Sequence, residues 1–301
     1  MTETNNKIQD SLNILNSSND YKVLSRVPET IKQKEPNGKK FKAAFIDLET
    51  TGVDRNEAEI IEIGVLVASF TNEDGFVAIE FTDNQLQEPK IPISAEITRI
   101  TGITNDDVKG KAIDWQGLHH NLTDIDLVIC HNASFDRQFL ELKTPIFFKE
   151  FIESLPFGCS FAGVNWNEFG FEGGKLEYLN LKMGYFYEGH RALVDCYATL
   201  NLFIEKVDAF ERLKDHVRSN EILICAVNAP YNKKDILKKR KYRWSSGDGN
   251  LPKCWWVSIS SEDYEAEKMF LEQDIYMNNS LDLPTKKITA KERYSLRAEA
   301  I

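Results

Sequence analysis

Two acidic residues, Asp47 and Glu49, end a strongly apolar segment of the chain in the motif D-L-E-T-T-G. Because side chains alternate along a strand, residues two apart share a face, and both carboxylates then lie at one end of a sheet. Two adjacent like charges are unfavourable unless a cation neutralises them, and Mg²⁺ prefers carboxylate oxygens. The pair is a candidate metal site, although D-x-E alone also fits a solvated strand end.

Two more acidic residues lie in separate segments. Asp136 ends H-N-A-S-F-D at the start of a predicted helix, where an acid also suits the helix dipole. Asp195 follows His190 in H-R-A-L-V-D, again on a predicted helix. Five helical residues turn by about 140°, so His190 and Asp195 face one site only if His190 precedes the helix. Imidazole exchanges protons near neutral pH, which makes His190 either a candidate general base or a structural residue.

The elements that must position these residues are predicted from the apolar patterns. Residues 41–49, 60–70 and 75–83 are rich in β-branched residues or alternate, and they predict three strands in an antiparallel meander. A buried strand is predicted for 126–132. Helices are predicted within 93–108, on both sides of Gly102, and in 112–122, 133–142, 175–183 and 191–207. Strands that alternate with helices predict an α/β fold, a mixed sheet flanked by helices.

The chain outside residues 41–210 has a different character. Residues 1–40 form a polar N-terminal extension, in which SLNIL and YKVLSRV predict a short docked helix or two with mobile flanks. Residues 221–278 predict a small basic α+β module, with Ser261 as a candidate helix cap. Residues 279–301 form a charged C-terminal tail that is predicted to pack as a short helix or to fray.

The composition of the chain excludes or disfavours several classes of protein. The chain has 301 residues, of which 42% are hydrophobic and 28% charged, and this excludes a fibrous or wholly disordered protein. No apolar run approaches about 18 residues and no secretory pattern is present, so no membrane partner is expected and the expected location is cytoplasmic. The five cysteines form no C-x-x-C pair and no H-E-x-x-H motif occurs, which disfavours a disulfide framework and a zinc hydrolase.

The net charge of −10 hides an asymmetry. Residues 228–256 contain eight basic and two acidic residues, a local charge of +6, which leaves −16 for the rest. This basic island could bind a single strand through phosphates and base stacking, or it could be a solvated helix face beside tryptophans of a small core. Its basic and aromatic members are Lys238, Lys239, Arg240, Lys241, Arg243, Trp244, Trp255 and Trp256.

In chain order, the motifs D-x-E, H-N-x-x-F-D and H-x-A-x-x-D resemble those of the DEDDh class of DnaQ-like 3′–5′ exonucleases. The epsilon subunit of bacterial DNA polymerase III and ribonuclease T are relatives in that family. The resemblance runs from Phe41 to about Val207 and includes the segment ITRITGIT. Thr101 departs from the pattern, since relatives commonly have His before this Gly. The resemblance implies a ribonuclease H-like fold.

The resemblance also implies metal-dependent hydrolysis of single-stranded DNA or short RNA from the 3′ end, with release of nucleoside 5′-monophosphates. Two Mg²⁺ or Mn²⁺ ions per active site would bind Asp47, Glu49, Asp136 and Asp195, and His190 would be the general base. From the residues themselves, Gly184 and Gly189 on either side of YFYE predict that His190 lies in a mobile loop that closes over the substrate. The residues expected to contact the terminal nucleotide are Leu48, Thr50, Thr51, Asn132 and Phe135.

Two questions stay open at the level of sequence. Phe135 is four residues from Phe139, so it is as well explained by core packing as by contact with a base. A catalytically silent nucleic-acid-binding or polymerase-docking module is the alternative function, although such a module gains nothing from clustered carboxylates. A polymerase or a second copy of the chain is a candidate partner by loose analogy with relatives.

Overall fold

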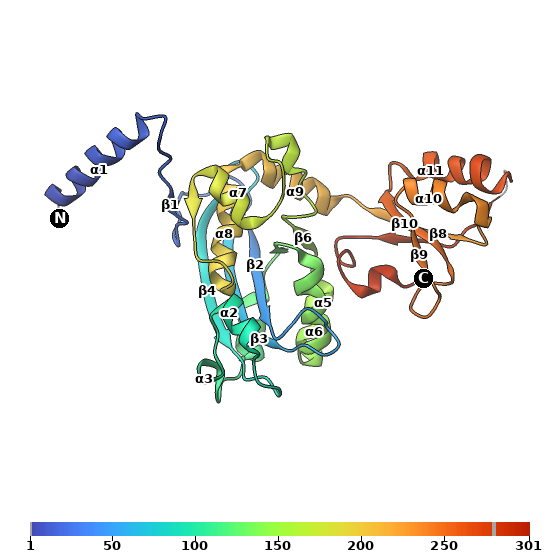
Figure 1. Cartoon of the computed structure of the whole chain (residues 1–301), viewed down its shortest axis with the longest axis horizontal. Helices are drawn as coiled ribbons and strands as arrows, with labels where there is room; N and C mark the ends of the chain where they lie inside the picture. Colours follow the sequence, from blue (N-terminus) through green and yellow to red (C-terminus); the bar gives the residue numbers. More distant parts are fainter. Residues whose placement is uncertain (1, 279–280) are drawn as a thin grey trace.

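A mixed five-stranded sheet forms the centre of the computed structural model, which describes residues 2–278 and 281–301 (Figure 1). The strand order is β4-β3-β2-β5-β6, with β2, β3 and β4 antiparallel and with β5 and β6 parallel to β2. The predicted meander and mixed sheet are therefore confirmed. The strands are β2 (Phe41–Thr50), β3 (Ile60–Thr71), β4 (Gly75–Leu86), β5 (Leu127–Cys130) and β6 (Phe157–Cys159).

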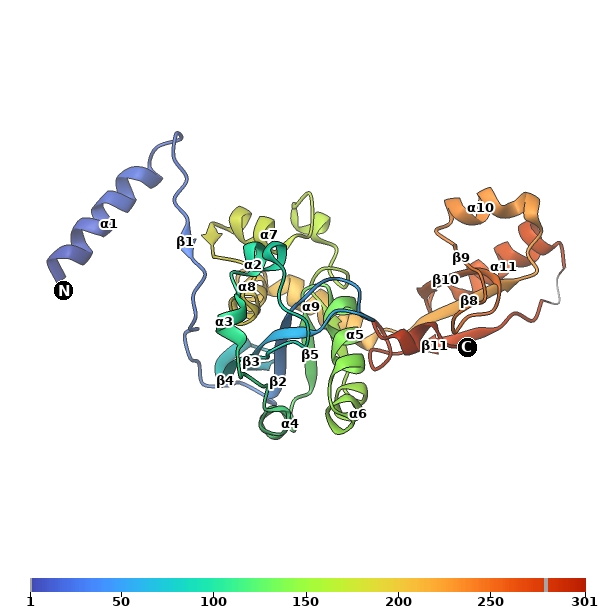
Figure 2. The same cartoon turned by 60° about the horizontal axis from the view of Figure 1, so that its bottom comes forward.

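Helices cover both faces of this sheet, so the predicted α/β class is confirmed (Figures 1 and 2). One face packs against α4 (Trp115–Leu122), α5 (Ala133–Lys143) and α6 (Ile146–Ser154). The other packs against α7 (Leu176–Met183), α8 (Ala192–Glu205) and α9 (Val207–Arg218). Two short helices on either side of Gly102, α2 (Ala95–Thr101) and α3 (Asn105–Val108), were also predicted. A 3₁₀ turn, η1 (Trp166–Phe169), precedes α7.

Alternation along β2 decides which side chains enter each layer. Ile46 and Leu48 join the core beneath α5, whereas Phe45 joins the core beneath α8. Since residues two apart share a face, Asp47 and Glu49 lie on the side of α8. The strand thus presents both carboxylates to the helix that carries Asp195.

The C-terminal module has its own four-stranded sheet, in the order β11-β8-β10-β9, with every pair antiparallel. The predicted α+β architecture is present, but the sheet extends beyond the predicted bound at residue 278, because β11 belongs to it. Its strands are β8 (Glu221–Val227), β9 (Arg243–Ser245), β10 (Cys254–Ser260) and β11 (Thr285–Ile288). Its helical elements are η2 (Tyr231–Lys233), α10 (Lys234–Lys239), α11 (Tyr264–Phe270), the π-helical turn η3 (Leu271–Tyr276) and the 3₁₀ turn η4 (Leu296–Glu299).

Two predictions for this region were wrong. Ser261 is not the helix cap, because α11 begins after Asp263, whose side chain makes no capping hydrogen bond. The tail is neither frayed nor only a short helix, because it contributes β11, which pairs with β8 and buries Ile288 in the module core.

After β11, the tail returns to the half of the molecule that contains the five-stranded sheet. The Arg137 side chain on α5 is fully buried, and it donates hydrogen bonds to the backbone oxygens of Ala290, Lys291 and Arg293. The Phe157 N–H on β6 also donates to the Ala290 oxygen, at 2.9 Å. These contacts hold the tail against α5, the helix that carries Asp136.

The N-terminal extension differs from its prediction. The helix α1 (Thr2–Asn16) is present, but it projects from the molecule, and Ile8 and Ile14 are 54% and 70% exposed rather than docked (Figures 1 and 2). The segment YKVLSRV is extended and not helical. It contains β1 (Ser25–Arg26), which pairs in parallel with β7 (Tyr185–Phe186). Within the described ranges, no helix is long and apolar enough to cross a membrane.

Candidate active site

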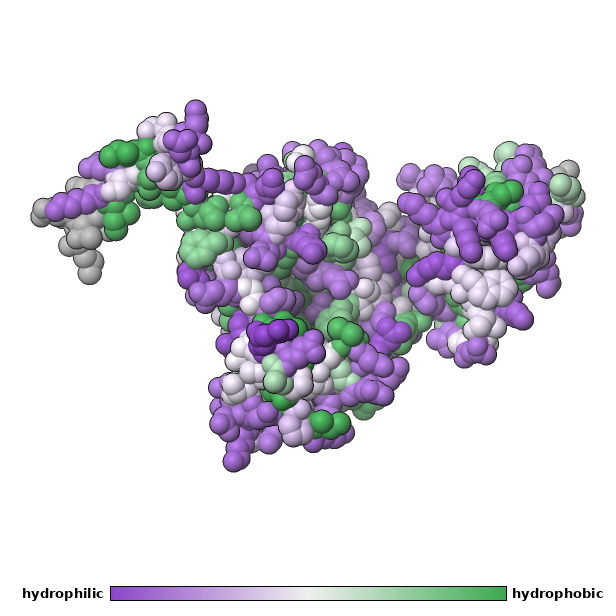
Figure 3. All heavy atoms as spheres, in the orientation of Figure 1, coloured by the Kyte–Doolittle hydropathy of each residue, from purple (hydrophilic) through white to green (hydrophobic). Residues whose placement is uncertain are grey.

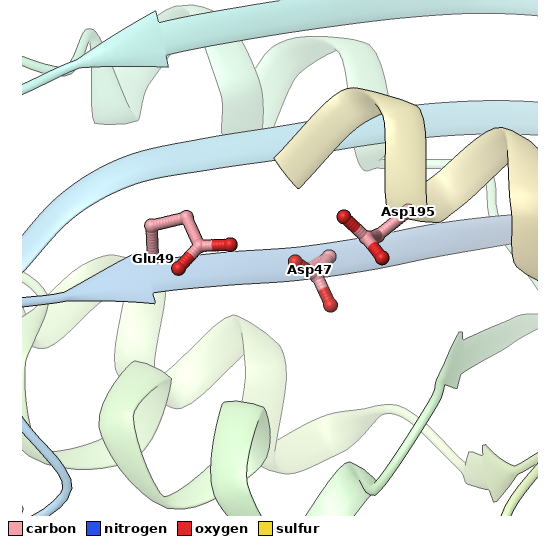
Figure 4. Close-up of side chains that lie close together, drawn as sticks. All are labelled: Asp47, Glu49 and Asp195. Atoms are coloured by element: carbon pink, nitrogen blue, oxygen red, sulfur yellow. The ribbon is translucent and has the colours of Figure 1, made fainter. Parts of the chain in front are cut away.

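Three of the predicted ligands meet between the end of β2 and the first turn of α8 (Figure 4). Oxygen atoms of Asp47, Glu49 and Asp195 all lie within 4.8 Å of one another. Such an all-oxygen donor set is the kind that Mg²⁺ and Mn²⁺ prefer. The face-sharing argument from the sequence therefore placed the first two carboxylates correctly.

The fourth carboxylate, Asp136, lies beside this group but is turned towards the backbone. Its side chain is 2% exposed, and its Oδ1 accepts a hydrogen bond from the Leu48 N–H at 3.1 Å. It also lies close enough to Asp47 for its charge to raise the pKa of that residue. Asp136 therefore lies next to the three-carboxylate cluster, and one of its oxygens is hydrogen-bonded to the backbone of β2, the strand that carries Asp47.

The electrostatics of the site disfavour four ionised carboxylates without a cation. Burial and the charges of Asp136 and Asp195 raise the pKa of Asp47 well above its usual range. Burial and the charge of Asp195 raise the pKa of Glu49 to about 8, and burial raises the pKa of Asp195 to about 6. Burial also raises the pKa of Asp136. A divalent cation reverses this tendency because it stabilises the charged forms.

The approach of α8 to the cluster depends on a glycine that sequence reasoning missed. Gly64 on β3 lies opposite Asp47 in the strand ladder. A Cβ atom at Gly64 would lie 2.2 Å from the Leu193 nitrogen and 2.3 Å from the Ala192 carbonyl carbon. The first turn of α8 therefore touches the strand directly. The available signal was a glycine inside an otherwise apolar strand, a mark of close backbone approach.

A buried acid two residues earlier fixes the same turn. Glu62 is fully buried, and it accepts hydrogen bonds from the Ala192 N–H at 3.0 Å and from the Arg191 guanidinium at 2.8 Å. Asn84 on β4 donates a third, at 2.9 Å. A charge inside an apolar strand requires such partners, so Glu62 in I-I-E-I-G was also open to detection from the sequence.

His190 lies in the loop directly before α8, as the geometric argument required. The side chain is exposed, and the backbone has a φ of 64°, which is uncommon for a residue other than glycine. Tyr187, three residues earlier, lies beside Asp195, and its hydroxyl favours the charged form of that carboxylate by lowering its pKa. Tyr187 was not singled out from the sequence. The loop was expected to be mobile, but its first part, β7, is paired with β1.

Two of the predicted nucleotide contacts, Asn132 and Phe135, line a hollow of about 250 Å³ at the start of α5. The Phe135 ring also packs on Phe139, with centroids 4.8 Å apart, so the core-packing interpretation is correct for part of that ring. The other lining residues are Val53, Arg55, Ser134, Gln138 and Phe139.

The remaining three predicted contacts use their polar groups within the protein. The Leu48 N–H donates to Asp136, and the Thr50 hydroxyl donates to the Gly52 carbonyl at 2.6 Å. The Thr51 hydroxyl oxygen accepts from the Glu59 N–H at 2.9 Å. Their contact with a nucleotide stays a prediction. Thr101, the departure from the family pattern, is buried, and its hydroxyl donates to the Ile97 carbonyl.

Residues 44–203 match the family model RNase_T, whose description is exonuclease. The chain is 35% identical over 99 residues to the PolC-type DNA polymerase III of Thermotoga petrophila, a match that covers 32% of this chain and 7% of the polymerase. The chain therefore spans a small fraction of that relative. It is also 29% identical over 195 residues to an uncharacterized exonuclease, CP81, of Escherichia phage 186, covering 60% of this chain and 95% of the phage protein.

Solved structures with a related arrangement include Exonuclease X in complex with 5′-overhanging duplex DNA. That chain is 21% identical, with a TM-score of 0.42 and coverage of 58% of this chain and 98% of the other. Another is E. coli Exonuclease I in complex with a 5cy-dT13 oligonucleotide, 14% identical, with a TM-score of 0.46 and coverage of 73% and 63%.

Proposed function

The chain belongs to the RNase_T family of exonucleases, and from this premise we propose that it removes nucleotides from the 3′ end of single-stranded DNA or short RNA. The products are nucleoside 5′-monophosphates. The observation that carries the proposal is the convergence of Asp47, Glu49 and Asp195 within 4.8 Å, beside Asp136. A protein that only bound nucleic acid would gain nothing from buried like charges, which disfavours a catalytically silent module.

The four carboxylates fit a pair of divalent cations. Asp47, Glu49, Asp136 and Asp195 carry four negative charges when ionised, which balance two Mg²⁺ or two Mn²⁺ ions. When bound, such ions activate the attacking water and stabilise the charge that develops on the leaving 3′ oxygen. The protein's own contribution is to hold the carboxylate oxygens converged, through the strand geometry of β2 and the tight contact of α8 with Gly64.

His190 is the proposed general base. It is exposed at the start of the helix that carries Asp195, so its imidazole can take the proton of the attacking water from the solvent side of the cluster. Substrate-driven movement of this residue would be confined to residues 187–190, because β7 is hydrogen-bonded to β1. This is a smaller movement than closure of the whole loop.

The hollow beside Asn132 and Phe135 is the proposed site of the 3′-terminal nucleotide. The exposed part of the Phe135 ring offers a stacking surface for the base, which favours weak sequence preference. Leu48 and Thr50, at the end of β2, and Thr51, directly after it, remain proposed contacts. This arrangement does not select between ribose and deoxyribose, so both DNA and RNA ends are proposed substrates.

The proposed activity also bears on the partner and the cellular location of the protein. The likeness to a PolC-type polymerase favours a polymerase as partner, with a second copy of this chain as the alternative. Sedimentation of the chain alone and then with a polymerase separates the two. A cytoplasmic location is proposed, where 3′ ends of DNA and RNA are exposed.

Oligonucleotides labelled at the 3′ or the 5′ end test the proposed activity. DNA and RNA versions are incubated with the full chain and Mg²⁺ or Mn²⁺, then with chelator, and with the variants Asp47→Ala and His190→Ala. Stepwise shortening of the 5′-labelled strand is expected. It should be absent with chelator and in Asp47→Ala, and reduced to a slow residual rate in His190→Ala. Binding without cleavage would support the silent module instead, and internal cuts would contradict an exonuclease.

A further inference from the structure

The C-terminal sheet has an open edge, β9, that carries an exposed aromatic side chain. Trp244 on β9 is 52% exposed, and its ring centroid lies 5.4 Å from that of Trp255, its ladder partner on β10. Trp256, in contrast, is only 6% exposed and belongs to the module core. The interpretation of the tryptophans as core residues is therefore correct for Trp256 and wrong for Trp244.

A lysine lies beside this aromatic pair, and two more lysines lie close to it in the chain. The Lys238 ammonium lies 5.9 Å from the centroid of the Trp255 ring. In the described part of the chain, Lys238, Lys239 and Lys241 are exposed and form no ion pair with a carboxylate. The two arginines of the basic island are engaged, Arg240 with Glu267 and Arg243 with Glu299. These three lysines are thus available to a polyanionic partner.

We infer that Trp244, Trp255, Lys238, Lys239 and Lys241, here called the tryptophan–lysine edge, bind single-stranded nucleic acid upstream of the 3′ end. Exposed aromatic rings stack on any base, and unpaired lysines displace counterions from phosphates. The local charge of +6 within a chain of net charge −10 gives the complementarity. In the view of Figure 3 the module is covered mainly by hydrophilic residues, which suits a polyanion better than an apolar protein face.

This inference rests on the proposed function for the identity of the strand, but its test does not need cleavage. The Asp47→Ala chain, in chelator, is titrated with a fluorescein-labelled dT20 oligonucleotide, and anisotropy is followed at several salt concentrations. Binding is compared for added Trp244→Ala, Trp244→Phe and the triple change Lys238→Glu, Lys239→Glu, Lys241→Glu. Lys287→Glu is the matched control, because Lys287 is an exposed lysine on β11, the opposite edge of the same sheet.

Trp244→Ala is expected to weaken binding by about tenfold, since stacking on one base is typically worth this much, and Trp244→Phe is expected to restore most of it. The triple change is expected to lower the slope of log K against log salt by about 2, at about 0.7 per lost phosphate contact. Lys287→Glu should bind normally. If all variants bind as tightly as this control, the inference is overturned, whether or not the wild-type chain cleaves DNA.

A separate observation concerns residues 22–27, here called the N-terminal strap. Ser25 and Val27 donate backbone hydrogen bonds to the carbonyls of Gly184 and Phe186, each at 2.9 Å. Arg26 adds an ion pair with Glu188, at 3.5 Å, and lies over the Phe186 ring. The strap precedes residue 44, where the family match begins, and it is the partner of β7 in a two-stranded sheet.

The loop that the strap holds leads directly to His190. Only three residues separate the end of β7 from that histidine, whose positive φ must be maintained by its surroundings. We propose that the strap is a positioning element for His190, so that a segment outside the exonuclease core sets the rate of the reaction. This second inference also rests on the proposed function.

Ser25→Pro removes the N–H that donates to Gly184, whereas Ser25→Ala keeps it and is the matched control. Misplacement of His190 is expected to lower kcat by roughly tenfold to a hundredfold with KM changed less than about twofold. In a His190→Ala background, Ser25→Pro should have no further effect. An unchanged kcat in Ser25→Pro, or an equal loss in the His190→Ala background, would contradict the proposal. Thermal unfolding identifies any general loss of folding, and Arg26→Ala then serves as the second variant.

Discussion

The acidic end of the exonuclease sheet and the tryptophan–lysine edge both collect like charges, but in opposite environments. Asp47, Glu49 and Asp195 are partly buried, and burial raises the pKa values of all three. Repulsion by neighbouring carboxylates raises the pKa values of Asp47 and Glu49 further. The lysines of the edge are exposed to solvent. Buried like charges suit a compact divalent ion, whereas exposed ones suit an extended polyanion with its own counterions.

Of the changes that separate the functions of the two regions, Asp47→Asn is expected to have the largest effect. It removes one charge from the acidic end with little change of shape. Cleavage should fall by at least about a thousandfold, because bound metal ions supply several kcal/mol to such reactions. Binding of dT20 in chelator should be unchanged, because the tryptophan–lysine edge is intact. Cleavage rates and the anisotropy of labelled dT20, measured on the same preparation, check both expectations. Loss of binding together with cleavage would show that the two regions are not separate.

A smaller effect is expected from Gly64→Ala. The added Cβ would meet the backbone of α8 at 2.2 Å, so the helix must move and carry Asp195 with it. A displacement of about 1 Å typically costs a hundredfold in rate, so a loss of that order is expected, with some loss of stability. Gly173→Ala is the control, because nothing lies within 4 Å of a Cβ there. Equal activity of the two variants would show that α8 does not need this contact.

The smallest expected effect is that of pH on the stability of the metal-free protein. The folded-state pKa values of Glu49, about 8, and Asp195, about 6, lie above the usual values for these side chains. Between the usual pKa of about 4 and these raised values, the folded protein therefore binds more protons than the unfolded chain. The free energy of unfolding of the metal-free protein falls as the pH rises through this range.

Thermal unfolding at pH 5 and pH 8.5 measures this effect. Mg²⁺ should raise the midpoint by a few degrees at pH 8.5 and by less at pH 5, because protons already neutralise the site there. Glu49→Gln should reduce the pH dependence of the metal-free protein. An equal effect of Mg²⁺ at both pH values would mean that the ion stabilises the protein elsewhere.

Much of the exonuclease sheet could be predicted because its signals are local. Apolar alternation and β-branched residues marked β2, β3 and β4, and Gly102 marked the turn between two helices, where it has a φ of 72°. The same alternation placed Asp47 beside Glu49. The separation of His190 from Asp195 correctly put the histidine before the helix.

The missed features depend on distant partners. β1 has two residues and pairs with Tyr185 and Phe186, and β11 has four and pairs with β8, so neither has a strong pattern of its own. Glu62 is buried because Arg191 and Ala192 reach it from far along the chain. Conversely, α1 has an apolar pattern, but its Ile8 and Ile14 side chains are exposed and do not dock.

The most direct test of the metal site is anomalous scattering from crystals of the wild-type chain soaked with Mn²⁺ and a nucleoside 5′-monophosphate, the proposed product. The account predicts two strong peaks among the carboxylates of Asp47, Glu49, Asp136 and Asp195, with the nucleotide in the hollow beside Phe135. Crystals with ordered nucleotide and no manganese among these carboxylates would contradict it.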